Sequence, residues 1–173
     1  MKIVIAGGSG FLGSALSRTL ARDGHDVSIL TRSAAVRVEP PLSAVRWNPD
    51  GTAGPWSGVI NGADIVVNLA GESIAATRWS AAQKQKLRDS RLLATRSLTT
   101  AIREAPRPPA ALVSGSAVGY YGDRGNETIT ETSSPGTDFL ALLAKDWEAE
   151  AKDVSSITRV ALVRTGIVLD RRG

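Results

Sequence analysis

The chain has 173 residues, no cysteine, a single histidine (His25) and a formal net charge of +4. This length supports one complete hydrophobic core and leaves little room for a second domain of ordinary size. The absence of cysteine excludes disulfide scaffolds, thiolate zinc sites and cysteine nucleophiles, and one histidine argues against a histidine-rich site, so we expect no metal centre. No apolar run approaches the roughly 20 residues of a membrane span, and the N-terminal segment lacks the pattern of a signal peptide. We therefore expect a cytoplasmic protein without membrane contact.

The charges are unevenly distributed along the chain. Residues 78–107 hold eight basic and two acidic residues, whereas residues 123–153 hold eight acidic and three basic residues. The basic stretch holds only one aromatic residue, Trp79, so the pattern does not favour nucleic-acid binding. Two oppositely charged helices packed side by side explain the pattern more simply. A basic cleft for an anionic ligand is also compatible with it.

Apolar runs bounded by turn residues alternate with segments of helical periodicity. Strands are predicted at residues 2–6, 26–31, 45–47, 64–70, 110–114 and 157–164, and helices at residues 11–23, 80–105 and 137–153. The apolar runs are too continuous for a sheet with one solvated face, so they predict a parallel sheet covered by helices on both faces. The predicted fold class is α/β, a doubly wound Rossmann domain of about six strands over residues 1–173.

A glycine-rich turn follows the first predicted strand. The sequence GGSGFLG places Gly7, Gly10 and Gly13 in G-x-x-G-x-x-G spacing. The first glycine permits a sharp turn, the second lets the backbone approach a diphosphate, and the third lets helix and sheet pack closely. The N-terminus of the next helix offers free N–H groups to phosphates. The turn therefore predicts a dinucleotide site, and a plain glycine-rich turn is the alternative. The cofactor-binding residues predicted in the turn are Gly7, Ser9, Gly10, Phe11, Leu12 and Gly13.

The end of the second predicted strand bears on the choice of cofactor. NAD-binding proteins commonly place an acidic residue there to hold the ribose hydroxyls. Here Thr31 and Arg32 occupy this place, and no carboxylate stands beside them. Because a guanidinium can clamp a 2′-phosphate through paired hydrogen bonds, Arg32 favours NADP(H) over NAD(H). The alternative is that Arg32 is a solvated loop residue.

Further segments resemble the extended short-chain dehydrogenase/reductase superfamily, in its NAD-dependent epimerase/dehydratase group. The likeness is greatest to an atypical branch whose members are called epimerase family proteins. The segments are GGSGFLG at 7–13, NLAGESI at 68–74, Arg78-Trp79, Ser90-Arg91, SGSAVGYYGD at 114–123, Asp138-Phe139-Leu140 with Trp147-Glu148, and RTGIVL at 164–169. Members of this branch are typically longer, so the resemblance implies a cofactor-binding part without most of a C-terminal substrate-binding region.

The resemblance implies roles for residues that follow the fourth and fifth predicted strands. Leu69, Ala70 and Gly71 would run along the phosphates and the nicotinamide ribose of the cofactor. Ser114 and Ser116 stand where the superfamily places its catalytic serine, and Ser116 is the candidate for that role. A hydroxyl that caps a turn is the alternative reading of Ser116.

Three charged residues are candidates on the substrate side. Arg164, in the sixth predicted strand, would lie near the substrate side of the nicotinamide. The loop after the fourth predicted strand offers Glu72 as an acid or base and Arg78 as an anion clamp. For Glu72 and Arg78, a surface salt bridge is an equally acceptable reading.

The chain departs from the superfamily at its usual Tyr–Lys pair. In the superfamily, a tyrosine exchanges a proton with the substrate, and a lysine one helical turn later lowers the tyrosine pKa and binds the nicotinamide ribose. The matching positions hold Phe139 and Leu143. Tyr120 and Tyr121 are the phenols nearest the site; adjacent residues of an extended segment point opposite ways, so at most one should face the cofactor. We expect Tyr121, ahead of Tyr120, to replace the missing donor, with packing under the sheet as the alternative.

Three functional hypotheses remain. The first is an NADP(H)-dependent enzyme acting on a carbonyl or alcohol, with a nucleotide sugar suggested only by analogy. The second is a catalytically silent NADP(H)-binding protein that senses redox state or supports a partner, which the missing Tyr–Lys pair favours. The third, a Rossmann domain without cofactor, is disfavoured by the glycine turn. A homodimer through helices 80–105 and 138–153 is possible, although the two helices can also neutralise each other within one subunit.

Overall fold

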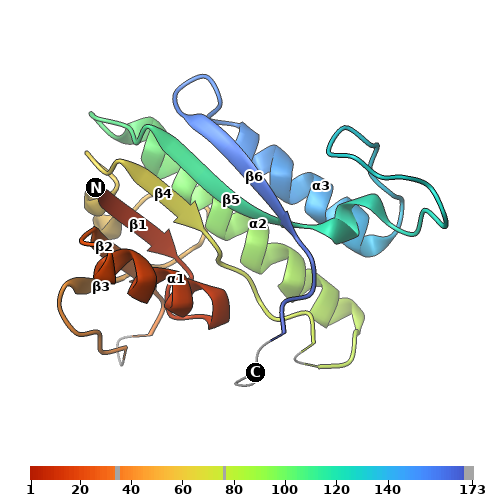
Figure 1. Cartoon of the computed structure of the whole chain (residues 1–173), viewed down its shortest axis with the longest axis horizontal. Helices are drawn as coiled ribbons and strands as arrows, with labels where there is room; N and C mark the ends of the chain where they lie inside the picture. The colour runs from red at the N-terminus through yellow and green to blue at the C-terminus, as the bar shows by residue number, and fades with distance from the viewer. Residues whose placement is uncertain (34–35, 76, 170–173) are drawn as a thin grey trace.

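The structure, a computed structural model, describes residues 1–33, 36–75 and 77–169. Its centre is a six-stranded, wholly parallel sheet with the strand order β3-β2-β1-β4-β5-β6 (Figure 1). The strands are β1 (Lys2–Ala6), β2 (Asp26–Thr31), β3 (Leu42–Arg46), β4 (Ile65–Asn68), β5 (Ala111–Ala117) and β6 (Arg159–Thr165). The α-helices are α1 (Phe11–Arg22), α2 (Ala81–Glu104) and α3 (Phe139–Lys152), and two short 3-10 helices are η1 (Pro55–Val59) and η2 (Val118–Tyr121).

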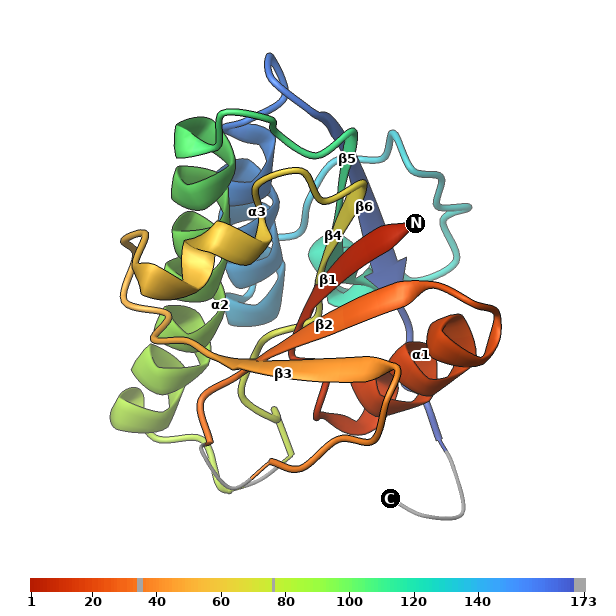
Figure 2. The same cartoon turned by 90° about the vertical axis from the view of Figure 1, so that its left-hand side faces the viewer.

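Both faces of the sheet are covered, as the continuous apolar strands predict. Helix α1 lies on one face, and α2 and α3 lie on the other (Figure 2). Side chains of β1 alternate between the two cores: Val4 and Ala6 belong to the cluster beneath α2, whereas Ile3 and Ile5 belong to the cluster beneath α1. A strand that is buried on both sides needs an apolar residue at every buried position, which explains the unbroken run IVIA after Lys2. The doubly wound Rossmann prediction is confirmed.

Strands β1 and β2 match their predicted ranges, strands β3, β4, β5 and β6 differ from theirs, and the largest extensions are those of β3 and β5. Strand β3 begins at Leu42, three residues before the predicted start, because this edge strand is largely exposed and carries little apolar pattern. Strand β5 continues to Ala117 because it pairs with β6 up to Ala117 opposite Thr165. This extension places Ser116 inside β5 rather than beyond it.

The expectation that Tyr120 and Tyr121 point opposite ways, as in a strand, is wrong. Both residues lie in the 3-10 helix η2, which follows β5 directly. Their rings meet edge to face, with centroids 5.3 Å apart, and both rings contact the guanidinium of Arg164. A 3-10 turn does not alternate its side chains between two faces, so both phenols reach the same cation.

The oppositely charged helices α2 and α3 lie side by side, as the charge pattern predicts (Figure 2). Three ion pairs join them: Arg88 with Asp146, Arg96 with Glu150 and Arg103 with Asp153. The pairs advance in the same direction along both helices, as parallel crossover helices require. The charge pattern is thus explained within one chain, and the homodimer stays a prediction that sedimentation of the purified chain can check. No helix in the described part of the chain is long and apolar enough to cross a membrane.

Candidate functional site

The glycine turn brings the N-terminus of α1 against the segment that follows β4. Gly7 has a φ of +79°, and a Cβ atom there would lie 2.7 Å from the carbonyl oxygen of Leu69. A Cβ atom at Gly13 would lie 2.1 Å from the carbonyl oxygen of Gly7. Gly10 is the N-cap of α1 and has no side chain to accept from the first-turn N–H groups. The turn therefore has the close backbone approach and the open helix terminus that fit a bound diphosphate.

Two clefts meet at this turn. The β2-side cleft, of about 170 Å³, is lined by Gly7, Ser9, Gly10, Leu30, Thr31, Arg32, Trp47, Pro49, Leu69, Ala70, Gly71, Ser90 and Ala94. The β5-side cleft, of about 620 Å³, is lined by Gly7, Gly10, Phe11, Leu12, Gly13, Leu16, Val67, Leu69, Ala70, Gly71, Glu72, Ser73, Arg91, Val113, Gly115, Ser116, Trp147, Val163 and Thr165.

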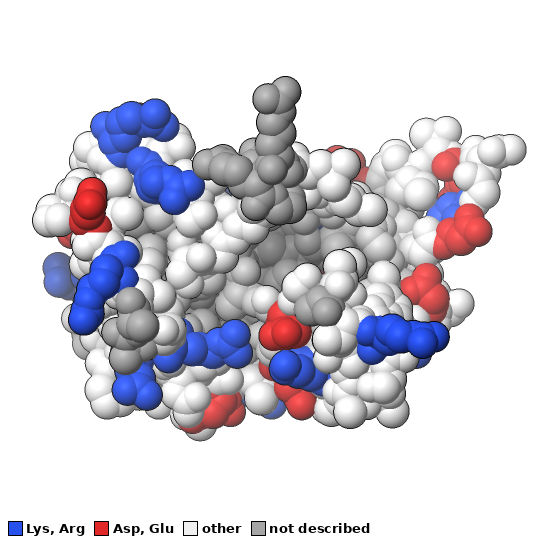
Figure 3. All heavy atoms as spheres, turned by 90° about the horizontal axis from the view of Figure 1, so that it is seen from below, with Lys and Arg blue, Asp and Glu red and all other residues white. Residues whose placement is uncertain are grey.

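The two clefts form a groove across the carboxyl ends of the strands, because they share five lining residues of the glycine turn and of the segment after β4. From below, the molecule is hollowed near its centre, and acidic and basic side chains lie close to the lower edge of the hollow (Figure 3). The groove lies where the chain order of the strands reverses between β1 and β4, the place at which doubly wound sheets bind ligands.

The β2-side cleft holds a cation and no carboxylate among its lining residues. Arg32 is its one ionisable side chain, and it lies at the end of β2 next to the buried Thr31. Ser9, from the glycine turn, lines the same cleft. A single guanidinium beside a hydroxyl suits an added phosphate better than a pair of ribose hydroxyls.

The hydroxyl of Ser116 is held by a buried carboxylate. Ser116 lines the β5-side cleft, is 3% exposed and donates to Oε1 of Glu148 at 2.7 Å. Glu148, on α3, is 2% exposed and accepts two further hydrogen bonds from Arg164, at 2.7 and 2.8 Å. Burial raises the pKa of Glu148, but the hydrogen bonds from Arg164 and Ser116 and the charge of Arg164 outweigh it, so the pKa lies below its ordinary value. Glu148 is therefore a carboxylate at neutral pH, and the Ser116 hydroxyl, which donates to it, keeps its lone pairs as acceptors.

Arg164 is committed to protein groups rather than to the groove. It binds Glu148 through two nitrogens, donates to the Tyr121 hydroxyl at 2.8 Å and to the Glu131 carbonyl at 3.0 Å, and stacks on Tyr120 at 3.6 Å from the ring centroid. Its pKa is raised, chiefly by the hydrogen bonds to Glu148. Neither Arg164 nor the two phenols line the β5-side cleft, although the chain neighbours of Arg164, Val163 and Thr165, do line it.

The positions that match the superfamily's Tyr–Lys pair are apolar in the structure. Phe139, the first residue of α3, meets Trp79 edge on at 5.8 Å between ring centroids, with the Lys84 ammonium 5.1 Å from the Phe139 ring centroid. Leu143 is 4% exposed and belongs to the core. No ionisable group stands at either position.

The structure brings most of the predicted cofactor residues to the groove. Those that line one or both clefts are Gly7, Ser9, Gly10, Phe11, Leu12, Gly13, Thr31, Arg32, Leu69, Ala70 and Gly71, together with Glu72 and Ser116. Ser114 is fully buried, and its hydroxyl lies 3.4 Å from the amide nitrogen of Asn68, so it faces the core. Arg78 is exposed and does not line either cleft.

Sequence reasoning missed Arg91 and Trp147 as residues of the β5-side cleft, and Ser90 as a residue of the β2-side cleft. Ser90 and Arg91 follow Leu87 by three and four residues, so they lie on its side of α2, which packs into the core. The signal in the sequence was the presence of two polar residues, Ser90 and Arg91, on the face of the helix that packs into the core. Trp147 gave no such signal, because an aromatic residue on a buried helix face is ordinary core.

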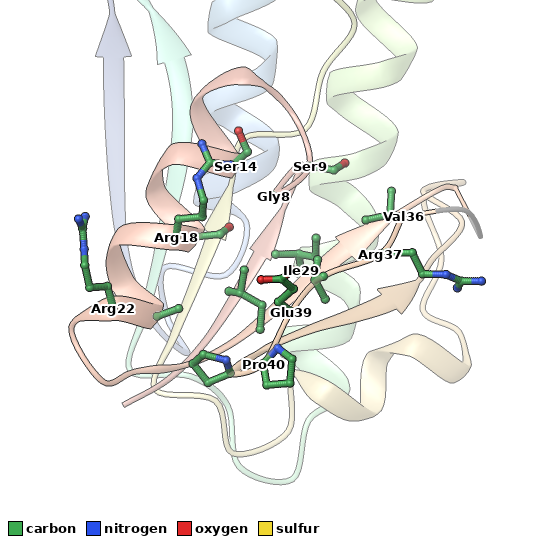
Figure 4. A pocket seen from close by; sticks show the side chains of 15 residues that line it. Gly8, Ser9, Ser14, Arg18, Arg22, Ile29, Val36, Arg37, Glu39 and Pro40 are labelled. Carbon is green, nitrogen blue, oxygen red and sulfur yellow. The ribbon is translucent and has the colours of Figure 1, made fainter.

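A further cavity, of about 720 Å³, lies between α1 and the segment before β3 (Figure 4). It includes Gly8 and Ser9 but no residue of the segment after β4, so it lies beside the groove rather than within it. Arg22 and Arg37 extend from opposite sides of this cavity and point away from each other (Figure 4). These two cations therefore do not converge on one ligand. Among the described residues, no group of three or more His, Asp or Glu side chains could hold a metal ion.

Comparison with known proteins agrees with this geometry. Residues 3–141 match the model of the NAD dependent epimerase/dehydratase family. The chain is 42% identical to the epimerase family protein Mb2239 of Mycobacterium bovis, over 99% of this chain and 55% of that protein. It is 36% identical to the epimerase family protein YfhF of Bacillus subtilis, over 100% of this chain and 57% of that protein. The chain thus spans about half the length of the curated relatives it matches.

Solved structures give the same result. The human epimerase family protein SDR39U1, crystallised with NADPH, superposes with a TM-score of 0.85 at 34% identity, over 100% of this chain and 56% of that one. The nucleoside-diphosphate sugar epimerase of Corynebacterium glutamicum superposes with a TM-score of 0.81 at 38% identity, over 99% of this chain and 35% of that one. The chain belongs to the NAD-dependent epimerase/dehydratase family and is similar to the N-terminal part of its longer members.

Proposed function

We propose that this chain binds NADP(H) in the groove and takes part in the oxidation or reduction of a carbonyl or alcohol substrate. The observation that carries the proposal is the pair of clefts joined at the glycine turn, with Arg32 as the one ionisable residue of the β2-side cleft. The relative crystallised with NADPH supports the choice of cofactor.

The two ends of the groove suit the two halves of a dinucleotide. Gly7, Gly10 and the N-terminus of α1 would hold the diphosphate, and Arg32 with Ser9 would hold the 2′-phosphate. The nicotinamide half would then occupy the β5-side cleft near Ser116. The cofactor supplies hydride transfer when it is bound.

Ser116 and Glu148 supply the proton chemistry in this proposal. Because the Ser116 hydroxyl donates to Glu148, its free lone pairs can accept a hydrogen bond from a substrate hydroxyl. Loss of a proton from that hydroxyl to Ser116, with transfer of the serine proton to Glu148, gives a relay that needs no tyrosine. Tyr121 would act indirectly, by holding Arg164 against Glu148.

Cofactor choice is tested by titrating NADPH and NADH into the wild type and Arg32→Ala, with binding followed by nicotinamide fluorescence. Loss of paired hydrogen bonds to a phosphate should reduce the NADPH preference about 10- to 100-fold, or ~1.4–2.7 kcal/mol. Arg46→Ala is the matched control, since it removes the same charge from the end of the neighbouring strand and does not line the β2-side cleft. An unchanged preference in Arg32→Ala contradicts the assignment.

A catalytically silent NADP(H)-binding protein is the second candidate, favoured by the apolar side chains of Phe139 and Leu143. The enzyme and the silent binding protein are distinguished by following NADPH absorbance with a panel of aldehydes, ketones and oxo acids. Tight binding without oxidation of NADPH by any member supports the silent protein. Turnover that falls at least about tenfold in Ser116→Ala, with NADPH affinity unchanged, supports the enzyme.

A further inference from the structure

The guanidinium of Arg91 is fixed at the wall of the β5-side cleft. Its Nη1 donates to the Leu87 carbonyl at 3.1 Å, and its Nη2 donates to the Glu72 carbonyl at 3.0 Å. Its guanidinium carbon lies 5.4 Å from the ring centroid of Trp147. These contacts orient a planar cation that has further donors to offer, since a guanidinium carries five N–H groups.

The surroundings of Arg91 leave room for this orientation and little for any other. A Cβ atom at Gly71 would lie 3.2 Å from Cζ of Arg91, and a Cβ atom at Gly115 would lie 3.2 Å from Cη2 of Trp147. The Trp147 indole is itself fixed, because its N–H donates to Thr95 at 2.9 Å. Gly71, three residues after β4, and Gly115, within β5, thus leave space for the arginine and the ring behind it.

The charge of Arg91 has no carboxylate partner within the described residues. Both acceptors of its hydrogen bonds are neutral carbonyls, and no salt bridge joins it to an Asp or Glu there. Glu72 is the one acidic residue in the lining of the cleft, and its carboxylate lies 3.6 Å from the ammonium of Lys86. Burial lowers the pKa of Arg91, with an opposing contribution from Glu72. Burying part of a cation without an anionic partner costs free energy, and a bound anionic ligand would offset this cost.

The position of Arg91 distinguishes it from the phosphate-binding turn. It lines the β5-side cleft with Ser116 and Trp147 but does not line the β2-side cleft. The diphosphate already has the N-terminus of α1. We propose that Arg91 binds an oxyanion of the substrate, so that the substrate is a carbonyl or alcohol compound carrying a carboxylate or phosphate group. This inference rests on the proposed cofactor site and adds the substrate class to it.

The test measures binding by calorimetry in two steps: NADPH to the free chain, and then oxamate or inorganic phosphate to the chain saturated with NADP⁺. We expect the wild type to bind at least one of the two small anions, and Arg91→Gln to weaken that binding about 10- to 100-fold. NADPH affinity should change less than about threefold. Arg91→Lys keeps the charge but not the planar fork, so its affinity for the anion should lie between those of the wild type and Arg91→Gln.

Two matched variants separate the cation from its structural contacts. Arg88→Gln removes the same charge from α2 outside both clefts and should leave anion binding unchanged. Ser90→Ala removes the hydroxyl that accepts from the Glu72 N–H at 3.0 Å, so it loosens the same loop while keeping Arg91. Anion binding should be at least threefold stronger in Ser90→Ala than in Arg91→Gln.

Each contrary result has its own meaning. Failure of both anions to bind a wild type that binds NADPH overturns the substrate-anion proposal and leaves the cofactor site standing. An equal loss of NADPH and anion affinity in Arg91→Gln overturns it in favour of the cofactor diphosphate as the anion. Equal losses of anion affinity in Ser90→Ala and Arg91→Gln would show that Arg91 only holds the loop after β4 in place. A wild type that does not bind NADPH overturns the proposed function and this inference together.

Discussion

Arg164, near the carboxyl end of β6, and Arg91, in the first half of α2, are two partly buried arginines with different partners. Arg164 donates to a buried carboxylate through two nitrogens and to a phenol through a third. Among the described residues, Arg91 donates to two carbonyl oxygens and lies over the ring of an indole. The protein satisfies the charge of the first and leaves the charge of the second uncompensated. Arg164 therefore belongs to the framework, whereas Arg91 has donors left for a ligand.

The comparison reverses the expectation drawn from the sequence, in which Arg164 was a candidate substrate residue and Arg91 had no role. Arg164 lies near the end of β6, and Arg91 lies within α2. The contacts of each guanidinium distinguish the roles of the two arginines. The paired N–H groups of Arg164 are bound to Glu148, so they are not free to bind a second anion.

The largest expected effect is on folding stability. Arg164→Gln should lower the free energy of unfolding by about 3–5 kcal/mol, since it leaves the carboxylate of Glu148 buried without its main cation. Arg91→Gln should lower it by only about 1–2 kcal/mol, since two carbonyls lose one donor each. Urea denaturation checks both values. Equal losses, or a larger loss for Arg91→Gln, would break the comparison.

The pH dependence of stability sharpens the same contrast. The pKa of Glu148 is lower in the folded chain than its ordinary value of 4.5, so its contribution to stability is present above pH 4.5 and is lost as the pH falls through the lowered folded value. Arg91 has no carboxylate partner of this kind. Below pH 4.5, the stability of Glu148→Gln should therefore fall less steeply with decreasing pH than that of the wild type. The stability of Arg91→Gln should fall as steeply as that of the wild type. Thermal unfolding between pH 3 and pH 7 measures this, and an unchanged slope in Glu148→Gln would contradict the assignment of Glu148.

The phenols should have a smaller effect. Tyr121→Phe removes the hydroxyl that accepts from Arg164 and should cost about 1 kcal/mol, while NADPH affinity stays the same. If Tyr121 also supports the chemistry by holding Arg164 against Glu148, turnover of an identified substrate should fall several-fold. Tyr120→Phe, which keeps the stacked ring, is the control. If neither variant changes turnover, the phenols have no part in the reaction.

The exposed ion pairs between α2 and α3 should matter least. Arg96→Gln removes a pair with Glu150 and should change stability by less than about 1 kcal/mol, because water and salt screen this pair. The effect should shrink further at high ionic strength, unlike that of Arg164→Gln. Denaturation in low and high salt compares the two variants, and a loss near 3 kcal/mol for Arg96→Gln would show that charge removal alone explains both.

Much of the fold follows from local sequence patterns. Unbroken apolar runs predict the doubly buried strands, and the glycines at 7, 10 and 13 predict the turn because backbone contacts leave no room for a Cβ atom at Gly7 or Gly13. The edge strand β3 was less well predicted, because it is largely exposed and has little apolar pattern. Most residues that line the groove were predictable because they lie on short segments directly after strands, where chain position fixes spatial position.

The sequence by itself determined the fold class, the glycine turn, the apolar residues Phe139 and Leu143 and the place of Arg32 after β2, since each depends on residues close together in the chain. Only the tertiary structure decided that Ser116 donates to Glu148, 32 residues away, and that both phenols contact Arg164. It alone placed Arg91 in the cleft without a carboxylate partner in the described chain. The physical reason is that satisfaction of a buried charge depends on groups from several elements, and their separations are fixed only when helices and strands pack together.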